Sequence, residues 1–396
     1  MGPGRSAKTI EWKRPMSLII FLVILGVLVI VHEWEHFITA KKLGVKVEQF
    51  AVGFGQKIFS KVHDGTEYRL CAIPLGGYVK MAGDERSQCQ GKPWEFFSKS
   101  PGHRALIVLM GPVVNFVFAY GCLYFTALLG TVDQQKTSEN FENKVPGVIG
   151  QVIENTPAQK AGLKEGDRII QINETPIKTW RELQTTIAAS KVEKLKIIFD
   201  RHGQVMTQDV FSQERTSHGK TIRVIGVAAP KTDFSPTKED IVILPSAGIF
   251  GSFVKAGEQL ATITLQTYSA VGEIFSGKRS AKETLTGPVG MYSFVQSAVA
   301  FFKFGPRIGF SFLLFLVGVI SASLAIFNLF PIVPLDGGHL FFLGIERLRG
   351  RTLSARADEM IARVGFSLMI TLALFIFYVD FERIGLIEKV MSFWTK

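Results

Sequence analysis

Val31-His32-Glu33-Trp34-Glu35-His36-Phe37 lies inside an apolar run that extends from Met16 to Ala40. On a helix, His32 and His36 are one turn apart on the same face, so both imidazoles can reach one zinc ion. The adjacent Glu33 can reach the same place, and a carboxylate there is the usual proton carrier for hydrolysis of a peptide bond. Ionisable side chains cost several kcal/mol inside a membrane unless they face a cavity or a partner. The stretch therefore predicts a zinc site within a membrane-spanning helix.

The motif leaves two alternatives open. Its five residues also match the inverted pattern His-x-x-Glu-His, in which Glu35 would be the base, and the spacing alone does not choose between Glu33 and Glu35. The two histidines could also belong to a surface helix of a soluble protein. A run of this length and apolarity is more typical of a membrane span, which favours the metal site.

The composition is also that of a membrane protein. Of the 396 residues 47% are hydrophobic, 33 are Phe, and the apolar residues occur in blocks. The net charge of +11 comes from Lys and Arg beside the apolar segments, without the aromatic-interleaved basic face that nucleic-acid binding needs. The three cysteines, Cys71, Cys89 and Cys122, form no CxxC pair. We therefore expect no nucleic-acid partner, and the cysteines give no indication of a disulfide.

Four apolar segments are predicted to span a membrane: 16–40, 105–130, 308–330 and 364–381. The first has no small-x-small cleavage site after its apolar stretch, so it is expected to be retained rather than removed as a signal peptide. Lys and Arg are abundant between the first two segments and before the last one. The positive-inside rule then places both connections on the cytoplasmic side, and residues 131–305 and both termini on the other side.

Within the first connection, Val47–Met81 alternates apolar and polar residues and contains turn signals, which is typical of β-hairpins. One of these signals is Gly76-Gly77. Hairpins that dip into the membrane would need their backbone groups paired with each other or with a bound strand. An exposed edge here could hold a substrate in extended form by strand addition. A small soluble sheet is the alternative.

From Val145 to Ala229 the pattern changes to strand, turn, short helix, turn and strand, followed by an amphipathic helix at Trp180–Ser190. The Ala161-Gly162-Leu163 and Gly166-Asp167-Arg168-Ile169 elements resemble a PDZ domain of the bacterial membrane-protease type. Such domains bind a peptide terminus or strand beside an exposed edge. The resemblance implies that Val148, Ile149 and Gly150 form the loop that receives the carboxylate.

A further group of residues follows the third apolar segment. It begins with Asn328, continues through Pro331 and Pro334, and ends with Asp336-Gly337-Gly338-His339. Prolines and paired glycines are expected to break the helix at membrane depth, which is tolerated where the loop lines a cavity. Asp336 offers the oxygen ligand that a two-histidine site lacks, and His339 is the rival third ligand.

His32-Glu33-x-x-His36 together with Asn328-x-x-Pro331 and Leu335-Asp336-Gly337-Gly338 resembles the site-2 protease family of intramembrane metalloproteases. Other matching elements are Gly53-Phe54-Gly55, Ile73-Pro74-Leu75-Gly76-Gly77-Tyr78, Gly111-Pro112-x-x-Asn115 and Gly287-Pro288-Val289-Gly290. The resemblance implies zinc bound by His32, His36 and Asp336, with Glu33 as the general base and Asn328 holding an unwound substrate strand. It also implies hairpins that enter the membrane and a membrane-surface helical region after the PDZ domain that gates entry.

Three features depart from the family pattern. Glu35 stands where the family usually has a small residue, Val333-Pro334 replaces the expected order in the proline-rich loop, and one PDZ domain is expected where proteobacterial members carry two.

The expected fold is therefore a multi-pass α-helical membrane protein with four transmembrane helices, a membrane-associated β-hairpin region and one extracytoplasmic PDZ domain of α+β type. The expected function is zinc-dependent cleavage of single-pass membrane proteins within the lipid bilayer of the bacterial inner membrane, after a first extracytoplasmic cut. An inactive scaffold with a structural zinc site is the alternative. The expected segments are an N-terminal extension (1–15), the hairpin loop (41–104), the PDZ domain (145–229), the helical region (231–305) and the Asp-Gly-Gly loop (331–339), between the four spans.

Overall fold

The computed structural model describes residues 13–217, 220–230, 239 and 241–383. The predicted N-terminal extension therefore lies almost entirely outside the described residues, as does the start of the predicted helical region. The chain forms two compact units, one built from residues up to Thr131 and from Pro245 onward, the other from Val132–Leu244. Each unit has its own buried core.

The four predicted apolar segments are all helical in the first unit. They are α2 (Lys13–Lys42), α3 (Pro101–Leu129), α10 (Pro306–Asn328) and α12 (Ala355–Arg383). Each is long and apolar enough to cross a membrane. The last helix begins nine residues before the predicted segment, because it continues through polar residues such as Glu359 and Arg363, which lower the hydropathy but are good helix formers.

The other helices of this unit lie between these four in the sequence. They are η1 (Phe96–Ser98), α7 (Gly248–Phe275), α8 (Ala281–Thr284), α9 (Pro288–Ala300), η2 (Phe301–Phe304) and α11 (Asp336–Arg349).

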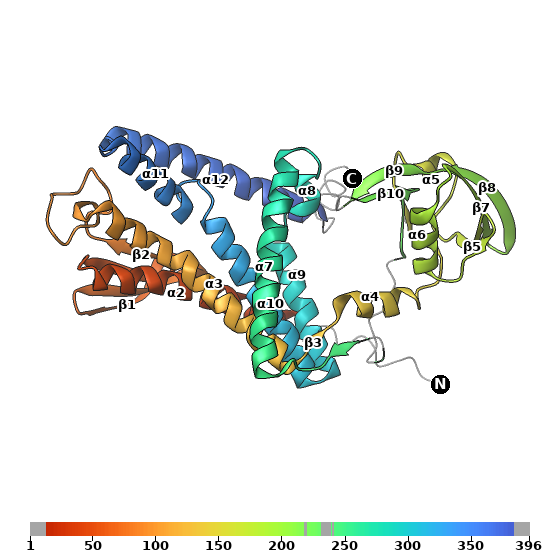
Figure 1. Ribbon diagram of the computed structural model, residues 1–396, viewed down its shortest axis with the longest axis horizontal. Coiled ribbons are helices and arrows are strands. Elements are labelled where there is room, and N and C mark those ends of the chain that lie inside the picture. Colours follow the sequence, from red (N-terminus) through yellow and green to blue (C-terminus); the bar gives the residue numbers. More distant parts are fainter. Residues whose placement is uncertain (1–12, 218–219, 231–238, 240, 384–396) are drawn as a thin grey trace. The chain divides into compact units, whose positions relative to one another are not determined.

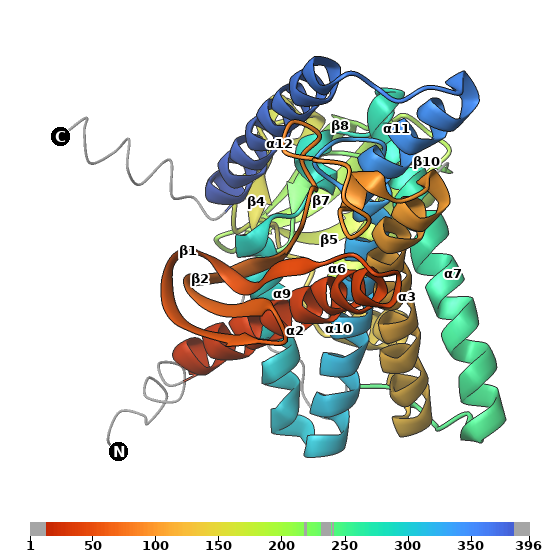
Figure 2. The ribbon, with the colours of Figure 1, turned by 90° about the vertical axis from the view of Figure 1, so that its left-hand side faces the viewer.

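Helix α3 is the centre of the first unit, where it packs against α2, α7, α10 and α11 (Figures 1 and 2). Its contact with α10 is made by small side chains, among them Ala119 on α3 and Ala322 on α10, both fully buried. At Gly318 of α10 an added Cβ would lie 3.2 Å from Leu123 of α3. Small residues allow helix backbones to approach closely where lipid removes the hydrophobic drive for association.

Helix α12 is joined to α9 by one buried carboxylate. Asp380 accepts hydrogen bonds from the backbone N–H groups of Gly287, Val289 and Gly290, at 3.1, 2.9 and 3.2 Å. These are N–H groups at the start of α9 that have no partner within the helix, so Asp380 caps α9 from a different helix. The Gly287-Pro288-Val289-Gly290 element thus has a structural reason, since a Cβ at Gly287 would overlap Asp380 and Ile376.

The predicted hairpin region consists of β1 (Val47–His63) and β2 (Thr66–Met81), and each strand folds back on itself. The first half of β1 pairs with both halves of β2, since Gln49 lies opposite both Lys80 and Glu67. The turn in β1 uses Gly53 and Gly55 at positive φ, and a Cβ at Gly53 would collide with the Ile73 carbonyl. Two strands therefore give four antiparallel segments, with residues 77–81 along one edge beside α2 (Figure 2).

The second unit contains a four-stranded sheet in the order β6-β5-β7-β8. Its elements are α4 (Gln134–Glu142), β4 (Gln151–Val152), α5 (Pro157–Lys160), β5 (Arg168–Ile172), β6 (Thr175–Pro176), α6 (Trp180–Ala189), β7 (Lys194–Arg201), β8 (Gln204–Phe211), β9 (Gln213–Ser217), β10 (Lys220–Val224) and β11 (Val227–Ala228); β3 (Thr131–Val132) and β12 (Ile243–Leu244) lie at its ends. Thr179 and Glu182 form a capping box at the start of α6. Asp133 N–H donates to the Val242 carbonyl at 2.8 Å, so the chain enters and leaves this unit at one place.

Candidate metal centre

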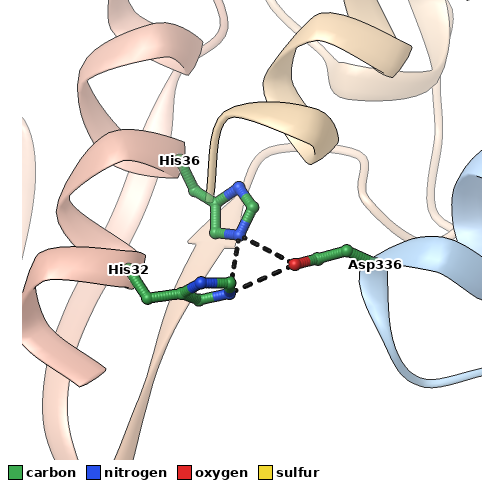
Figure 3. Close-up of side chains that lie close together, drawn as sticks. All are labelled: His32, His36 and Asp336. Carbon is green, nitrogen blue, oxygen red and sulfur yellow. Dashed lines mark hydrogen bonds and ion pairs between the residues drawn. The ribbon is translucent and has the colours of Figure 1, made fainter. Parts of the chain in front are cut away.

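Three side chains from distant parts of the sequence meet in the first unit. Figure 3 shows His32 and His36 on α2 directed at Asp336, the first residue of α11. Asp336 Oδ2 lies 3.1 Å from His32 Nε2 and 3.5 Å from His36 Nε2, and the two Nε2 atoms are 3.2 Å apart. Both histidines are buried, with 7% and 8% of their surface exposed. Among the described residues this is the only cluster of His, Cys, Asp and Glu with metal-ligand spacing.

These three distances fit a tetrahedral zinc ion. Zinc–ligand bonds of about 2.0–2.1 Å at tetrahedral angles put neighbouring ligand atoms roughly 3.3 Å apart. The buried Asp336 Oδ2 has no hydrogen-bond donor of its own. Direct ion pairs between Asp336 and the two histidines would require both imidazoles to be protonated. Their Nε2 atoms are only 3.2 Å apart, and repulsion between two positive charges opposes this state. A divalent cation satisfies all three atoms, so the residues fit the metal.

The charge state of Asp336 is also suitable. Burial raises the pKa of this carboxyl, but the adjacent imidazoles of His32 and His36 lower the pKa more, and the net shift is downward. The ionised carboxylate is the form that binds a metal. His339, the rival ligand, lies one turn further along α11 and does not join the cluster. Burial lowers the pKa of His339, so its imidazole is neutral.

The predicted Asp-Gly-Gly loop is shorter than expected, because α11 begins at Asp336 and the loop ends at Leu335. Gly337 and Gly338 are therefore helical and do not break the helix. A Cβ at Gly337 would overlap the Leu329 carbonyl, and one at Gly338 would lie 2.5 Å from the Val333 nitrogen. The paired glycines let the first turn of α11 pack directly on the preceding loop, which places Asp336 opposite the histidines. The Val333–Pro334 peptide bond in this loop is cis.

Helix α3 lies behind the two histidines and orients them. His36 Nδ1 donates to the Ile107 carbonyl at 2.8 Å, which leaves Nε2 free for a metal. At Gly111 a Cβ would overlap the imidazole of His36 and lie 2.8 Å from Cε1 of His32. The Gly111-Pro112-x-x-Asn115 element is part of the family resemblance, but the sequence alone assigns it no role. The available signal in the sequence is the polar Asn115 within an apolar span, because polar side chains are rare there.

We expect the Gly111→Ala variant to lose most of its zinc affinity, because the added methyl group would push both imidazoles away from the position of the shared metal ion. Competition with a chromogenic chelator measures the affinity. The matched control is Gly121→Ala on the same helix, where nothing lies within 4 Å of the added Cβ. Equal zinc affinity in the two variants would show that the close approach at Gly111 is unimportant.

The metal cluster opens into a cavity of about 1020 Å³. Glu33 lines this cavity together with His32 and His36, whereas Glu35 is not part of its lining. Gly76 and Gly77 on β2 also line it, and a Cβ at Gly77 would lie 3.3 Å from Cγ of Glu33. The amide nitrogen of Asn328, the last residue of α10, is 3.5 Å from His32 Nε2. The structure thus brings the predicted residues of the first unit to one cavity.

A buried ion-pair cluster joins the far end of α11 to α3. Arg104 on α3 and Arg86 in the preceding loop both pair with Glu346, and Glu346 also accepts from Leu353 N–H at 2.9 Å. Both guanidinium groups lie over the Phe97 ring. Removing one member of such a buried cluster typically costs about 3–5 kcal/mol. The cluster therefore fixes α11, and with it Asp336, to the helix that orients the histidines.

In the predicted carboxylate-binding loop of the second unit, the backbone N–H groups are already hydrogen-bonded within the protein. The N–H groups of Val148, Ile149 and Gly150 donate to the carbonyls of Pro146, Asp167 and Ala228, at 2.7, 2.8 and 2.9 Å. Ile149 is also part of the buried core of this unit. Binding of a peptide carboxylate by this loop would require these hydrogen bonds to open, and the role of the three residues stays a prediction.

Two imidazoles and a carboxylate focused on one point, with a second carboxylate in the same cavity, define a metal-dependent hydrolase site. The sequence comparison agrees with the geometry. Residues 20–372 match the model of peptidase family M50, and this chain belongs to that family.

Similar proteins come from several bacteria. The regulator of sigma-E protease RseP of Escherichia coli K12 is 27% identical, with 92% of this chain and 98% of that protein aligned. The same-named protein of Salmonella typhimurium is 28% identical over 93% of this chain and 99% of its own. Zinc metalloprotease RasP of Shouchella clausii is 26% identical, with coverage of 93% and 99%. The chain is a zinc metalloprotease with four helices apolar enough to cross a membrane, and the predicted enzyme class and cofactor are confirmed.

Proposed function

We propose that this protein is an intramembrane endopeptidase that cuts the transmembrane segments of single-pass membrane proteins at the site formed by His32, His36, Asp336 and Glu33. The observation that supports this most directly is that the three ligand atoms and Glu33 share one cavity, whose lining includes residues of all four helices that are apolar enough to cross a membrane. No fourth His, Cys, Asp or Glu joins the three ligands among the described residues, as expected for a catalytic site with an open position.

Each side chain has a defined task in this proposal. His32, His36 and Asp336 hold zinc, which supplies Lewis acidity toward the scissile carbonyl and lowers the pKa of a water. Glu33 takes a proton from the attacking water and delivers it to the leaving amine. Asn328 donates from its amide to a carbonyl of the bound peptide and keeps it in place beside His32.

The substrate is proposed to bind in extended form along β2. Residues 77–81 lie at an edge of the folded hairpin, and Gly77 allows that edge to lie close to Glu33. A peptide strand added there would satisfy the edge N–H and C=O groups and present an accessible peptide bond. This explains how a helical transmembrane segment, whose backbone is shielded, becomes cleavable once part of it unwinds.

The purified protein in detergent or liposomes tests this proposal with a single-pass model substrate. We expect cleavage inside the apolar segment, identified by mass spectrometry of the products, with loss of cleavage after chelation and recovery on adding zinc. Cleavage only in soluble flanking sequences, with the apolar segment left whole, would contradict the intramembrane assignment.

We further propose that the second unit resembles a PDZ domain in function and selects substrates on the extracytoplasmic side of a bacterial inner membrane. Support comes from its separate core and from the Lys and Arg distribution, which by the positive-inside rule favours a location of residues 131–305 opposite the cytoplasm. A folded domain on a substrate would be rejected sterically, and a trimmed stub would be accepted. On this proposal, a substrate with a folded extracytoplasmic domain must first be cut by another protease.

Deletion of residues 145–229 is expected to leave cleavage of trimmed substrates intact and to permit cleavage of substrates that retain their extracytoplasmic domain. Because Asp133 and Val242 are hydrogen-bonded, replacing 134–241 with a short Gly-rich turn is a matched second deletion that preserves the chain path. Both substrates are measured with each enzyme by product yield. If the deleted forms cut the trimmed substrate normally and still refuse the intact one, the unit is not the filter.

A further inference from the structure

The two histidines of the metal cluster are oriented by different kinds of partner. His36 Nδ1 donates to a backbone carbonyl, that of Ile107, which no substitution removes. His32 Nδ1 faces a side chain, the amide of Asn115 on α3, at 3.1 Å. Asn115 is completely buried, and its backbone carbonyl accepts a hydrogen bond from Ser321 Oγ of α10 at 2.8 Å. The orientation of one ligand therefore depends on a single replaceable amide.

The proton count at His32 decides which end of that amide must face the ring. A neutral imidazole carries one proton, and Nε2 needs its lone pair to bind a metal, so the proton must be on Nδ1. Nδ1–H then needs an acceptor. Of the two ends of the Asn115 amide, only the oxygen accepts, and Oδ1 is the atom of this residue that otherwise lies buried without a partner.

We propose that Asn115 is a positioning residue, which accepts a hydrogen bond from Nδ1–H of His32 through its amide oxygen and so fixes the tautomer that binds zinc. This requires a flip of about 180° of the Asn115 side-chain amide, so that Oδ1 takes the place of Nδ2 beside the His32 ring. With the nitrogen facing the ring, the amide would donate to Nδ1 and force the proton onto Nε2, the atom that points at Asp336. Metal binding and amide orientation are thus coupled.

Two variants of the full-length protein separate acceptance from donation. Asn115→Asp keeps an oxygen at the ring and cannot donate when ionised, and it forms the carboxylate–histidine pair common behind metal ligands. Asn115→Leu has a similar volume and neither accepts nor donates. We expect the Asp variant to retain zinc affinity within about threefold of wild type, and the Leu variant to lose about 10–100-fold.

The experiment measures the zinc dissociation constant by chelator competition, and the visible absorption bands of the Co²⁺-substituted protein as a readout of ligand geometry. We expect wild-type bands in the Asp variant and shifted or weakened bands in the Leu variant. Thermal unfolding of the zinc-free proteins controls for folding, and if the Leu variant does not fold, the Asp variant decides alone. Equal loss of affinity in both variants, or unchanged affinity in the Leu variant, overturns the proposal.

Discussion

Replacing Glu33 by Gln is expected to abolish cleavage while the enzyme keeps its zinc. Glu33 lines the cavity beside both histidines, and Gln has nearly the same shape but cannot take a proton from water. Loss of a general base typically costs about 10²–10⁴-fold in rate. We would measure cleavage of the model transmembrane substrate and, on the same preparations, zinc content by elemental analysis.

Glu35→Gln is the matched control, because the same substitution is made two residues away on the same helix. A helix rotates about 200° over two residues, so Glu35 points away from the side occupied by Glu33. Its absence from the cavity lining agrees with this geometry. We expect near wild-type activity in this variant. Full activity in Glu33→Gln combined with loss in Glu35→Gln would reverse the assignment of the base.

Replacing Asp336 by Ala is expected to remove stoichiometric zinc as well as activity. Two neutral imidazoles remain in that variant, and catalytic zinc sites hold the ion with three protein ligands. The carboxylate also supplies the only negative charge of the cluster, so its loss leaves the bound cation uncompensated. Zinc content after dialysis, and the activity of the dialysed protein with and without added zinc, give the result.

His339→Ala serves as the comparison for Asp336→Ala. His339 lines the same cavity and lies on the same helix, but it stands outside the cluster of three. We expect this variant to keep one zinc per chain and most of its activity. Zinc retained by Asp336→Ala and lost by His339→Ala would mean that the ligand set is His32, His36 and His339.

Much of the first unit could be predicted from the sequence because hydropathy and helical spacing act locally. The run from Met16 to Ala40 is a helix, and the spacing of His32 and His36 is enough to place both imidazoles on one side of it. The alternation in Val47–Met81 predicted strands, and these are β1 and β2. Such patterns report on neighbours a few residues apart, which is the range over which they are reliable.

The rest depended on contacts between distant residues. Nothing local to Gly111 or Asn115 indicates that two histidines some 80 positions earlier will lie against them. From the sequence, the glycines after Asp336 are expected to break the helix, whereas in the structure they allow close packing inside α11. The two roles can be told apart only when the position of the loop after Asn328 is known. The first half of β1 also pairs with both halves of β2. The alternation of apolar and polar residues does not specify which strand segments pair.

Because the metal ligands are far apart in the sequence, they are synthesised at different times. His32 and His36 leave the ribosome early, but the cluster remains one ligand short until Asp336 follows. At ~5–20 residues per second, the roughly 300 intervening residues take about 15–60 s to synthesise. During that interval the first helices can insert into the membrane without forming a working protease. A chain that stops before Asp336 therefore lacks the third ligand, and proteolysis at this site can begin only after Asp336 has been made.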